Sequence, residues 1–347
     1  MALHTIEELK LKQRLPLEIK IRMSKDRIRS WIDEYGEEGV YVSFSGGKDS
    51  TVLLDLVRQD YPNVKAVFVD TGLEYPEIKD FVKTFDNVDI VKPKLSFRQV
   101  IDKYGYPFIS KEVSQTVYEA KTALSNGKTN AYKVRCLNGQ LTDKHGNISR
   151  YNVSKYKFFL DAPFKVSHYC CNVMKKRPAK DYEKLTGKKP ILATMTEESQ
   201  LRVSTWLRQG CNAFDVKRPN SKPLSFWTEQ DILRYIKTRG LKIASVYGDI
   251  VVDYEDDEQS NGQLDFSDLG LIEDTRKYKT TGCRRTGCMF CGFGCQVEKP
   301  GEGRFERMKV THPKIYDYIM RPKEQGGLNY KEVIDWINDH SNLDIKY

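Results

Sequence analysis

Strand-like and helix-like patterns alternate along the first hundred residues. One apolar run ends at Phe44, and an amphipathic helical pattern begins around Ser50. Residues 64–72 and 88–94 are two further apolar runs, typical of buried parallel strands, and residues 76–85 between them have helical spacing. Short loops join these segments. The pattern predicts an α/β fold, with a doubly wound, mostly parallel sheet covered by helices on both faces.

The same alternation continues along the chain. We expect a helix over residues 16–35 that leads into the first strand, a helix over residues 170–185 and a strand over residues 190–196. A loop that carries Arg202 should follow this strand. Residues 222–240 form another helical segment with clear signals at both ends. Thr228 and Asp231 form a variant capping box at the start of the helix, and Gly240 ends it.

Two stretches interrupt the alternation. Residues 105–160 contain the turn signals SNGKTN, NGQ and DKHGNIS, so we expect an insertion with a helix near residues 110–124 and irregular or hairpin structure after it. Residues 251–275 are acidic and contain Gly and Ser, which is typical of a surface loop. The chain therefore divides into a helical lead-in, an α/β domain, and a C-terminal region with the acidic loop, a cysteine-rich segment and helices: residues 1–37, 38–250 and 251–347.

Composition restricts the class of protein. The chain has 347 residues, of which 39% are hydrophobic and 30% charged, as in ordinary folded proteins. No apolar run is long enough to cross a membrane, and the N-terminus lacks the core of a signal peptide, so we expect a cytoplasmic protein without a membrane partner. The net charge of +9 suits phosphate-rich ligands and permits nucleic-acid binding without establishing either.

The turn after the first apolar run has the chemistry of a phosphate site. Its two glycines let the backbone approach a ligand closely, and the unpaired N–H groups of the following helix attract anions. Lys48 adds a cation, and Asp49 or Ser50 is expected to cap the helix. It is not a Walker A loop, because Lys48 is followed by Asp49 and the four-residue gap between glycines is missing. The expected phosphate-binding residues are Ser45, Gly46, Gly47, Lys48, Asp49 and Ser50.

Cysteines concentrate in two places. The chain has eight, and in a cytoplasmic protein they are not expected to form structural disulfides. Two adjacent cysteines lie at 170 and 171, and four more have the spacing C-x4-C-x2-C-x3-C, interleaved with glycines that let a short loop bring several sulfurs to one metal centre. Spacing alone leaves both an iron–sulfur centre and a zinc site open. The two isolated cysteines, Cys136 and Cys211, are expected to be buried and inert.

Five motifs in order resemble the phosphoadenosine phosphosulfate (PAPS) reductase family of the adenine nucleotide α-hydrolase (PP-loop) superfamily. They are SFSGGKDS, VFVDTGLEYPE, HYCCNVMKKRP, EESQLR and KPLSFWTEQDI, within residues 38–300. The resemblance implies that the glycine loop holds the phosphates of an adenine nucleotide. It also implies that Asp70, Thr71 and Gly72 lie beside the adenosine and that Arg202 meets the anionic end. The catalytic residues would be Lys48, Asp49, Arg202 and Cys295.

The resemblance also suggests the cysteine ligands. In bacterial adenylylsulfate (APS) reductases, a Cys-Cys pair and a later Cys-x-x-Cys hold one [4Fe–4S] cluster close to the nucleotide. The matching positions here are Cys170, Cys171, Cys288 and Cys291, which we favour. The rival set uses all four C-terminal cysteines, namely Cys283, Cys288, Cys291 and Cys295.

Two departures from that family bear on the reaction. Assimilatory reductases carry a Glu-Cys-Gly-Leu-His tail with the attacking cysteine, whereas this sequence has no cysteine after Cys295. The attacking thiol is therefore either missing or relocated, to Cys295 or Cys283. The complete SGGKDS is the form found in ATP-cleaving members. We therefore expect cleavage of ATP to AMP and pyrophosphate, with Mg²⁺ sharing the charge, coupled to sulfur transfer onto an acceptor.

Two other functions stay open. One is true reduction of PAPS or APS to sulfite with a thiol reductant, and the other is a nucleotide-binding iron–sulfur accessory protein with little turnover. The expected partners are an adenine nucleotide and a sulfur donor or thiol reductant, with nucleic acid as one option for the acceptor. We also expect a homo-oligomer, an expectation with only weak support.

Overall fold

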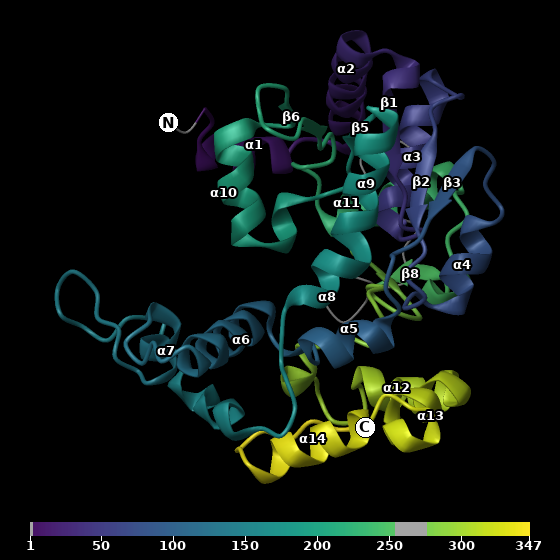
Figure 1. Cartoon of the computed structure of the whole chain (residues 1–347). Coiled ribbons are helices and arrows are strands. Elements are labelled where there is room, and N and C mark those ends of the chain that lie inside the picture. Colours follow the sequence, from purple (N-terminus) through teal and green to yellow (C-terminus); the bar gives the residue numbers. More distant parts are fainter. Residues whose placement is uncertain (1–2, 254–275) are drawn as a thin grey trace. The chain divides into compact units, whose positions relative to one another are not determined.

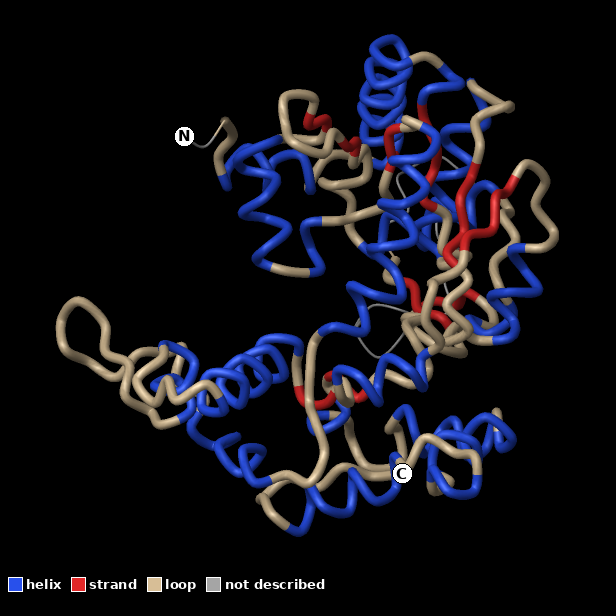
Figure 2. Tube along the Cα trace, viewed as in Figure 1, coloured by secondary structure: helices blue, strands red, loops and turns tan. Residues whose placement is uncertain are grey.

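The computed structural model describes residues 3–253 and 276–347, so most of the expected acidic loop lies outside the described residues (Figures 1 and 2). The chain divides into two compact units that differ from the three expected segments. The first unit consists of residues 1–70, 74–92 and 179–286, and the second of residues 71–73, 93–178 and 287–347.

Helices and strands alternate through much of the first unit, whereas the second unit is mainly helical. The elements of the first unit are α1 (Ile6–Gln13), α2 (Leu17–Tyr35), β1 (Val40–Ser43), α3 (Lys48–Asp60), β2 (Ala66–Val69), α4 (Pro76–Val82), β3 (Val88–Val91), α9 (Arg177–Thr186), β5 (Lys189–Ile191), α10 (Gln200–Gln209), β6 (Asn212–Ala213), β7 (Asn220–Ser221), α11 (Glu229–Arg239), β8 (Ile250–Val252) and β9 (Tyr278–Thr280). The elements of the second unit are α5 (Phe97–Tyr104), β4 (Phe108–Ile109), α6 (Lys111–Ser125), α7 (Tyr132–Leu137), α8 (Tyr169–Cys171), β10 (Gly292–Phe293), α12 (Arg304–Thr311), α13 (Pro313–Met320) and α14 (Tyr330–Asp339). The boundary between the units falls within α9.

A six-stranded sheet with the order β3-β2-β1-β5-β7-β6 forms the centre of the first unit. Every neighbouring pair is parallel except β6 and β7. Strand β1 pairs with β2 on one side, with Val42 opposite Ala66, and with β5 on the other, with Val42 opposite Ile191. The expected doubly wound, mostly parallel sheet is confirmed.

Alternate residues of β1 face opposite sides of the sheet, as the strand period requires. Val40 and Val42 belong to the main core, which also contains the apolar faces of α2, α3 and α11. Tyr41 lies in a smaller cluster with Val67 and Tyr182, and Tyr182 is on α9. The two faces of the sheet are therefore covered by different helices (Figure 1).

Helix boundaries follow the sequence signals at some ends and depart from them at others. Helix α11 begins at the expected capping box of Thr228 and Asp231. Helix α3 begins at Lys48, two residues earlier than expected, and Gly47 is its N-cap, so the expectation of a cap at Asp49 or Ser50 was wrong. The expected loop around Arg202 was also wrong, because this residue lies in the first turn of α10, where its N–H bonds to the Ser199 hydroxyl.

In the second unit, α6 confirms the helix expected near residues 110–124, and α13 and α14 confirm the helical C-terminal patterns. The expected helix over residues 170–185 is interrupted by a π-helical turn over residues 172–176, between α8 and α9. The short helix α7 replaces part of the irregular structure expected after α6. In the described part of the chain, no helix is both long and apolar enough to cross a membrane.

A buried ion pair connects α2 to the start of α11. The Lys20 ammonium lies 2.7 Å from the Asp231 carboxylate, and both side chains are almost fully buried. Lys20 also donates to the Gln13 carbonyl, and Asp231 accepts from the N–H and the hydroxyl of Thr228. Each charge therefore has several partners, which a buried charge requires.

Removal of one partner of this pair should destabilise the first unit strongly. We expect Asp231→Ala to cost about 3–5 kcal/mol of unfolding free energy, because Lys20 would be left buried without its counter-ion. The matched control is Asp60→Ala, which breaks the more exposed pair between α2 and α3 formed with Lys25 and should cost about 1 kcal/mol or less. Urea denaturation midpoints measure both, and equal losses would contradict the prediction.

Candidate functional site

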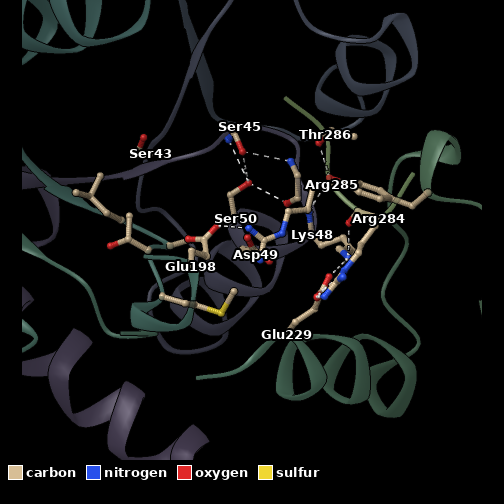
Figure 3. Close-up of a pocket in the computed structure, with 16 residues that line it drawn as sticks. Ser43, Ser45, Lys48, Asp49, Ser50, Glu198, Glu229, Arg284, Arg285 and Thr286 are labelled. Atoms are coloured by element: carbon tan, nitrogen blue, oxygen red, sulfur yellow. Dashed lines mark hydrogen bonds and ion pairs between the residues drawn. The ribbon is translucent and has the colours of Figure 1, made fainter. Parts of the chain in front are cut away.

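A cavity of about 260 Å³ lies in the first unit, where the chain leaves the carboxyl ends of β1 and β5 (Figure 3). The chain runs from β1 outward to β2 and β3 and then returns to the other side of β1, so the strand order reverses between β1 and β5. Ligands of open α/β sheets bind at such a point. The cavity is lined by Ser43, Ser45, Gly47, Lys48, Asp49, Ser50, Leu192, Ala193, Thr194, Met195, Glu198, Glu229, Tyr247, Arg284, Arg285 and Thr286.

The turn between β1 and α3 requires glycine. Gly46 has a φ of +70°, and a Cβ atom there would lie 2.8 Å from Val82 and 2.9 Å from Ile78. The two serines of the turn close it: the Ser45 N–H donates to the Ser50 hydroxyl at 3.1 Å, and the Ser50 hydroxyl donates to the Gly47 carbonyl at 2.9 Å. The turn therefore places the N-terminus of α3 against the cavity, where its partial positive charge favours an anion.

Lys48 is the buried cation of this cavity, with a side chain only 5% exposed. Its ammonium donates to the Arg284 carbonyl at 2.9 Å and lies 3.3 Å from the Glu229 carboxylate. Its backbone N–H donates to the Tyr247 hydroxyl, which in turn lies 2.5 Å from the Thr286 hydroxyl. The first residue of α3 thus contacts both α11 and the segment 284–286.

Glu229 balances two cations. The guanidinium of Arg284 donates twice to its carboxylate, at 3.0 and 2.6 Å, on the side opposite Lys48. Burial acts to raise the pKa of Glu229, but the hydrogen bonds and charges of Arg284 and Lys48 outweigh burial and lower the pKa below its usual value. Glu229 is therefore ionised at neutral pH. It forms ion pairs with Lys48 and Arg284, the same cations that an anionic ligand would bind.

Asp49 and Glu198 are the other carboxylates of the cavity. Burial raises the pKa of Asp49, although the charges of Lys48 and Arg285 oppose it. Glu198 forms ion pairs with Arg202 and with Arg285, the latter at 3.5 Å. The cavity thus holds cations whose charge is largely compensated by carboxylates of the same cavity.

The structure brings together most, but not all, of the expected nucleotide-binding residues. All expected residues of the glycine turn except Gly46 line the cavity, and Arg202 lies beside it, close enough to Asp49 for the two charges to affect each other's pKa values. Asp70 forms an ion pair with Lys79 at 2.7 Å. Thr71 and Gly72 belong to the second unit.

Several lining residues were missed by sequence reasoning. Tyr247, Thr286 and Glu229 match no phosphate motif, and the pair Arg284-Arg285 is indistinguishable in sequence from an ordinary solvated basic pair. A weak signal exists in that pair, because it lies inside the cysteine-rich segment, between Cys283 and Cys288. Its contact with Lys48 spans 236 residues and could not be derived from local pattern.

Four of the cysteines gather in the second unit. The thiols of Cys170 and Cys171 lie 4.0 Å apart. The hydrogen bond from Cys170 lowers the pKa of Cys171, with Lys175 and Lys111 contributing further. The pKa of Cys170 is raised by the same hydrogen bond and by burial, and the C-terminal thiols Cys288 and Cys291 lie near enough to add to this shift.

The loop that carries the C-terminal cysteines is held by buried polar contacts. The Tyr330 hydroxyl donates to the Phe290 carbonyl at 2.6 Å, and Arg304 donates to the Cys291 carbonyl at 2.7 Å. Gly292 passes so close to Phe108 that a Cβ atom there would lie 2.6 Å from its ring. These contacts fix the backbone on both sides of Cys291.

The other two cysteines of the C-terminal set are placed differently. Cys295 is buried, its thiol donates to the Gly292 carbonyl at 2.9 Å, and burial raises its pKa to about 12. Cys283 belongs to the first unit. Cys136 and Cys211 are buried, as expected.

The donor chemistry of the four gathered thiols fits a metal centre, because four thiolates are the usual ligands of iron–sulfur clusters and of structural zinc. Across residues 3–253 and 276–347, however, no group of three or more His, Cys, Asp or Glu side chains is arranged to hold a metal ion. The four thiols are therefore near one another, but they are not close enough together to coordinate a single metal ion in this arrangement.

Comparison with known proteins identifies a family and several relatives that match parts of the chain. Residues 39–126 match the family described as phosphoadenosine phosphosulfate reductase domain. An uncharacterized protein of Methanocaldococcus jannaschii is 35% identical over 123 residues, which cover 29% of this chain and 30% of that protein. An adenosine 5'-phosphosulfate reductase of Geobacillus kaustophilus is 40% identical over 70 residues, covering 20% of this chain and 27% of that enzyme. The chain thus spans less than a third of the length of these relatives.

A solved structure of phosphoadenylyl-sulfate reductase from Candida auris, in a phosphate complex, covers 70% of this chain and 90% of its own length. It is 15% identical in sequence, with a TM-score of 0.36.

The buried carboxyl of the cavity should make stability depend on pH. Because the pKa of Asp49 is raised in the folded chain, its ionisation destabilises the fold as the pH rises from the usual value of 3.8 through the folded value. We expect Asp49→Asn to raise the Tm of the first unit at pH 7 by roughly 2–4 °C, the shift that about 1 kcal/mol produces in a folding unit of roughly 150–250 residues, and to have less effect near pH 3.5. Thermal melting across this pH range measures the difference.

The control for this prediction is Asp33→Asn, which makes the same change at an exposed position of α2. It should leave the Tm almost unchanged at every pH. A gain for Asp49→Asn that is independent of pH, or no gain at pH 7, would contradict the prediction.

Proposed function

We propose that this chain, which belongs over residues 39–126 to the phosphoadenosine phosphosulfate reductase domain family, is an enzyme that binds an adenine nucleotide in the cavity after β1 and β5. In the reaction we favour, ATP is cleaved to AMP and pyrophosphate, and the activated acceptor receives sulfur. The observation that carries this proposal is the convergence of the α3 N-terminus, Lys48 and the Arg284-Arg285 pair on one cavity.

These groups suit a polyphosphate for physical reasons. Backbone N–H groups at a helix N-terminus bind phosphate oxygens without side-chain entropy cost, and Gly47, which lines the cavity, presents no side chain to a ligand. Arginine binds phosphate through two parallel hydrogen bonds, and a buried ammonium interacts more strongly than one in water. Lys48 and the two arginines would therefore bind the β- and γ-phosphates.

The chemical step requires charge stabilisation rather than covalent catalysis. An acceptor oxygen attacks the α-phosphorus, and the bond from that phosphorus to the bridging oxygen breaks, so that pyrophosphate leaves with the bonding electrons. Lys48, Arg284 and Arg285 would stabilise the charge that develops on pyrophosphate. A sulfur nucleophile then displaces AMP from the acceptor. A Mg²⁺ ion that accompanies the nucleotide would find the Asp49 carboxylate in the cavity.

The four gathered thiols are proposed to hold a [4Fe–4S] cluster through Cys170, Cys171, Cys288 and Cys291. Their proximity within the second unit supports this set over the rival one, which needs Cys283 from the first unit. When bound, such a cluster would supply an iron site that can carry the sulfur before its transfer.

A second function is favoured by the names of the relatives. The Geobacillus kaustophilus relative is an adenosine 5'-phosphosulfate reductase, and the same cavity would accept the phosphosulfate of that nucleotide. In that reaction a thiol attacks the sulfur, AMP leaves, and a second thiol releases sulfite while the two sulfurs form a disulfide. A thiol reductant would restore the enzyme.

Product analysis distinguishes the two. Purified anaerobically, the protein is incubated with ATP or with each sulfonucleotide plus a thiol reductant. AMP and pyrophosphate from ATP support the favoured reaction, whereas sulfite from APS or PAPS supports the second. Nucleotide binding with neither product would overturn both and leave an accessory role in nucleotide sensing or cluster assembly.

Lys48→Met should weaken nucleotide binding while it keeps most of the side-chain volume. A lost charge-assisted hydrogen bond of about 1.5–3 kcal/mol corresponds to roughly a 10- to 150-fold higher Kd for ATP, measured by calorimetry. Lys65→Met, which removes a half-exposed cation of the same unit, serves as the control and should leave the Kd unchanged. The visible absorbance of the cluster should be the same in both variants. Retained ATP affinity in Lys48→Met would exclude the phosphate role.

Single cysteine variants test the proposed cluster ligands. After anaerobic purification, we expect Cys171→Ser to lose most of the iron, the sulfide and the visible absorbance, because one of four ligands is missing. Cys283→Ser and the isolated control Cys211→Ser should retain them. The opposite result, with Cys283→Ser losing the cluster and Cys171→Ser keeping it, would support the rival set.

A further inference from the structure

The insertion, residues 105–160, carries most of the excess positive charge of the chain. It contains nine lysine and arginine residues against three aspartate and glutamate residues, a net charge of +6 in a chain whose total is +9. The whole insertion lies in the second unit, where α6 and α7 pack against each other (Figure 1). The excess charge is therefore concentrated on one structural element rather than scattered along the chain.

These cations lack acidic partners. Among the described residues, none of the nine forms an ion pair with a carboxylate; Lys121 donates to the Ala162 carbonyl and Lys133 to the Thr116 hydroxyl. In the first unit, by contrast, the half-exposed Lys65 and the exposed Lys83 pair with neighbouring aspartates. An ordinary solvated surface mixes both signs of charge, whereas this one leaves its positive charge uncompensated.

Two aromatic side chains of this positively charged insertion are exposed. Tyr132, the first residue of α7, is 55% exposed, and Tyr151 is 49% exposed. Lys133 lies over the ring of Tyr132, 5.7 Å from its centre, and Arg150 lies over that of Tyr151 at 5.2 Å. The Val153 N–H donates to the Cys136 carbonyl of α7 at 3.0 Å, so the segments that carry the two tyrosines lie next to each other.

We propose that the insertion binds a single-stranded nucleic acid, with bases stacked on Tyr132 and Tyr151 and phosphates bound by the surrounding cations. Exposed aromatic rings between unpaired cations are the two elements that single-strand binding requires, since every base has a face that can stack and every linkage carries a negative charge. This proposal does not depend on the proposed chemistry, because it rests on contacts of the second unit alone.

The tyrosines favour a single strand over other polyanions. In a duplex the base faces are already stacked on each other, so exposed rings gain nothing from it beyond phosphate contacts. An acidic peptide would match the charge but would offer no flat partner for both rings. Truncation of the tyrosines should therefore weaken the binding of a single strand, but not the binding of a duplex or of an acidic peptide.

The test measures binding to the full chain by fluorescence anisotropy. The probes are a labelled 20-nucleotide RNA and DNA of mixed sequence, the corresponding DNA duplex, and a glutamate-rich peptide of similar charge. We expect the single strands to bind more tightly than the duplex and the peptide, with an affinity that falls as salt rises. The RNA and DNA arms reveal which nucleic acid is preferred.

Variants assign the binding to this surface. Tyr132→Ala and Tyr151→Ala should each weaken single-strand binding roughly 5- to 150-fold, the range seen when a stacked aromatic is truncated. Tyr132→Phe keeps the ring and should bind nearly as well as the wild type. Arg150→Gln should lower the slope of log affinity against log salt by about 0.7, the value for one lost phosphate contact on a single strand.

Lys83→Gln is the matched control, since it removes an exposed cation from the first unit and should change nothing. Far-UV circular dichroism and thermal melting verify that the exposed substitutions leave the fold intact. The proposal is overturned if the wild type binds no single strand at low salt, if the alanine variants bind as well as the wild type, or if the duplex or the peptide binds equally well.

Discussion

The buried ammonium of Lys48 is the contact on which the cavity of the first unit depends. A charge that is 5% exposed must be paired, and its partners come from α11 and from the segment 284–286, which are 181 and 236 residues away. The need to pair this one charge therefore connects the start of α3 to two distant parts of the chain. The cavity exists where these three segments meet.

The topology of the sheet explains why the meeting point is hollow. Because β1 is central and the chain continues to β2 on one side and to β5 on the other, the segments that leave β1 and β5 diverge from each other. The glycine turn fills part of this gap without side-chain bulk. What remains is polar, and Glu229 holds Lys48 and Arg284 by ion pairs. An anionic ligand would replace the ion pairs of Lys48 and Arg284 with Glu229 by its own ion pairs with these cations. The binding free energy would therefore be the difference between the ion pairs formed and the ion pairs lost.

The second unit follows a different principle, in which aromatic packing fixes a polar loop. Tyr330 is fully buried against Tyr106 and Phe108, and its hydroxyl holds the Phe290 carbonyl beside Cys291. The π-helical turn after α8 directly follows the adjacent cysteines, and such turns are frequent at functional sites. The thiols are brought together by the packing of segments that are more than a hundred residues apart in sequence.

The sequence by itself determined the local features of this protein: the alternation of strands and helices along the first hundred residues, the capping box at Thr228, the glycine turn with Lys48, and the two groups of cysteines. These follow from hydrophobic period and backbone preference, which act over a few residues. Only the tertiary structure decided that α3 begins at Lys48, that Glu229, Tyr247 and Arg284 complete the cavity, and that Cys283 lies in a different unit from Cys288. Those outcomes depend on which charges and hydroxyls can be paired once distant segments pack together, and no local pattern carries that information.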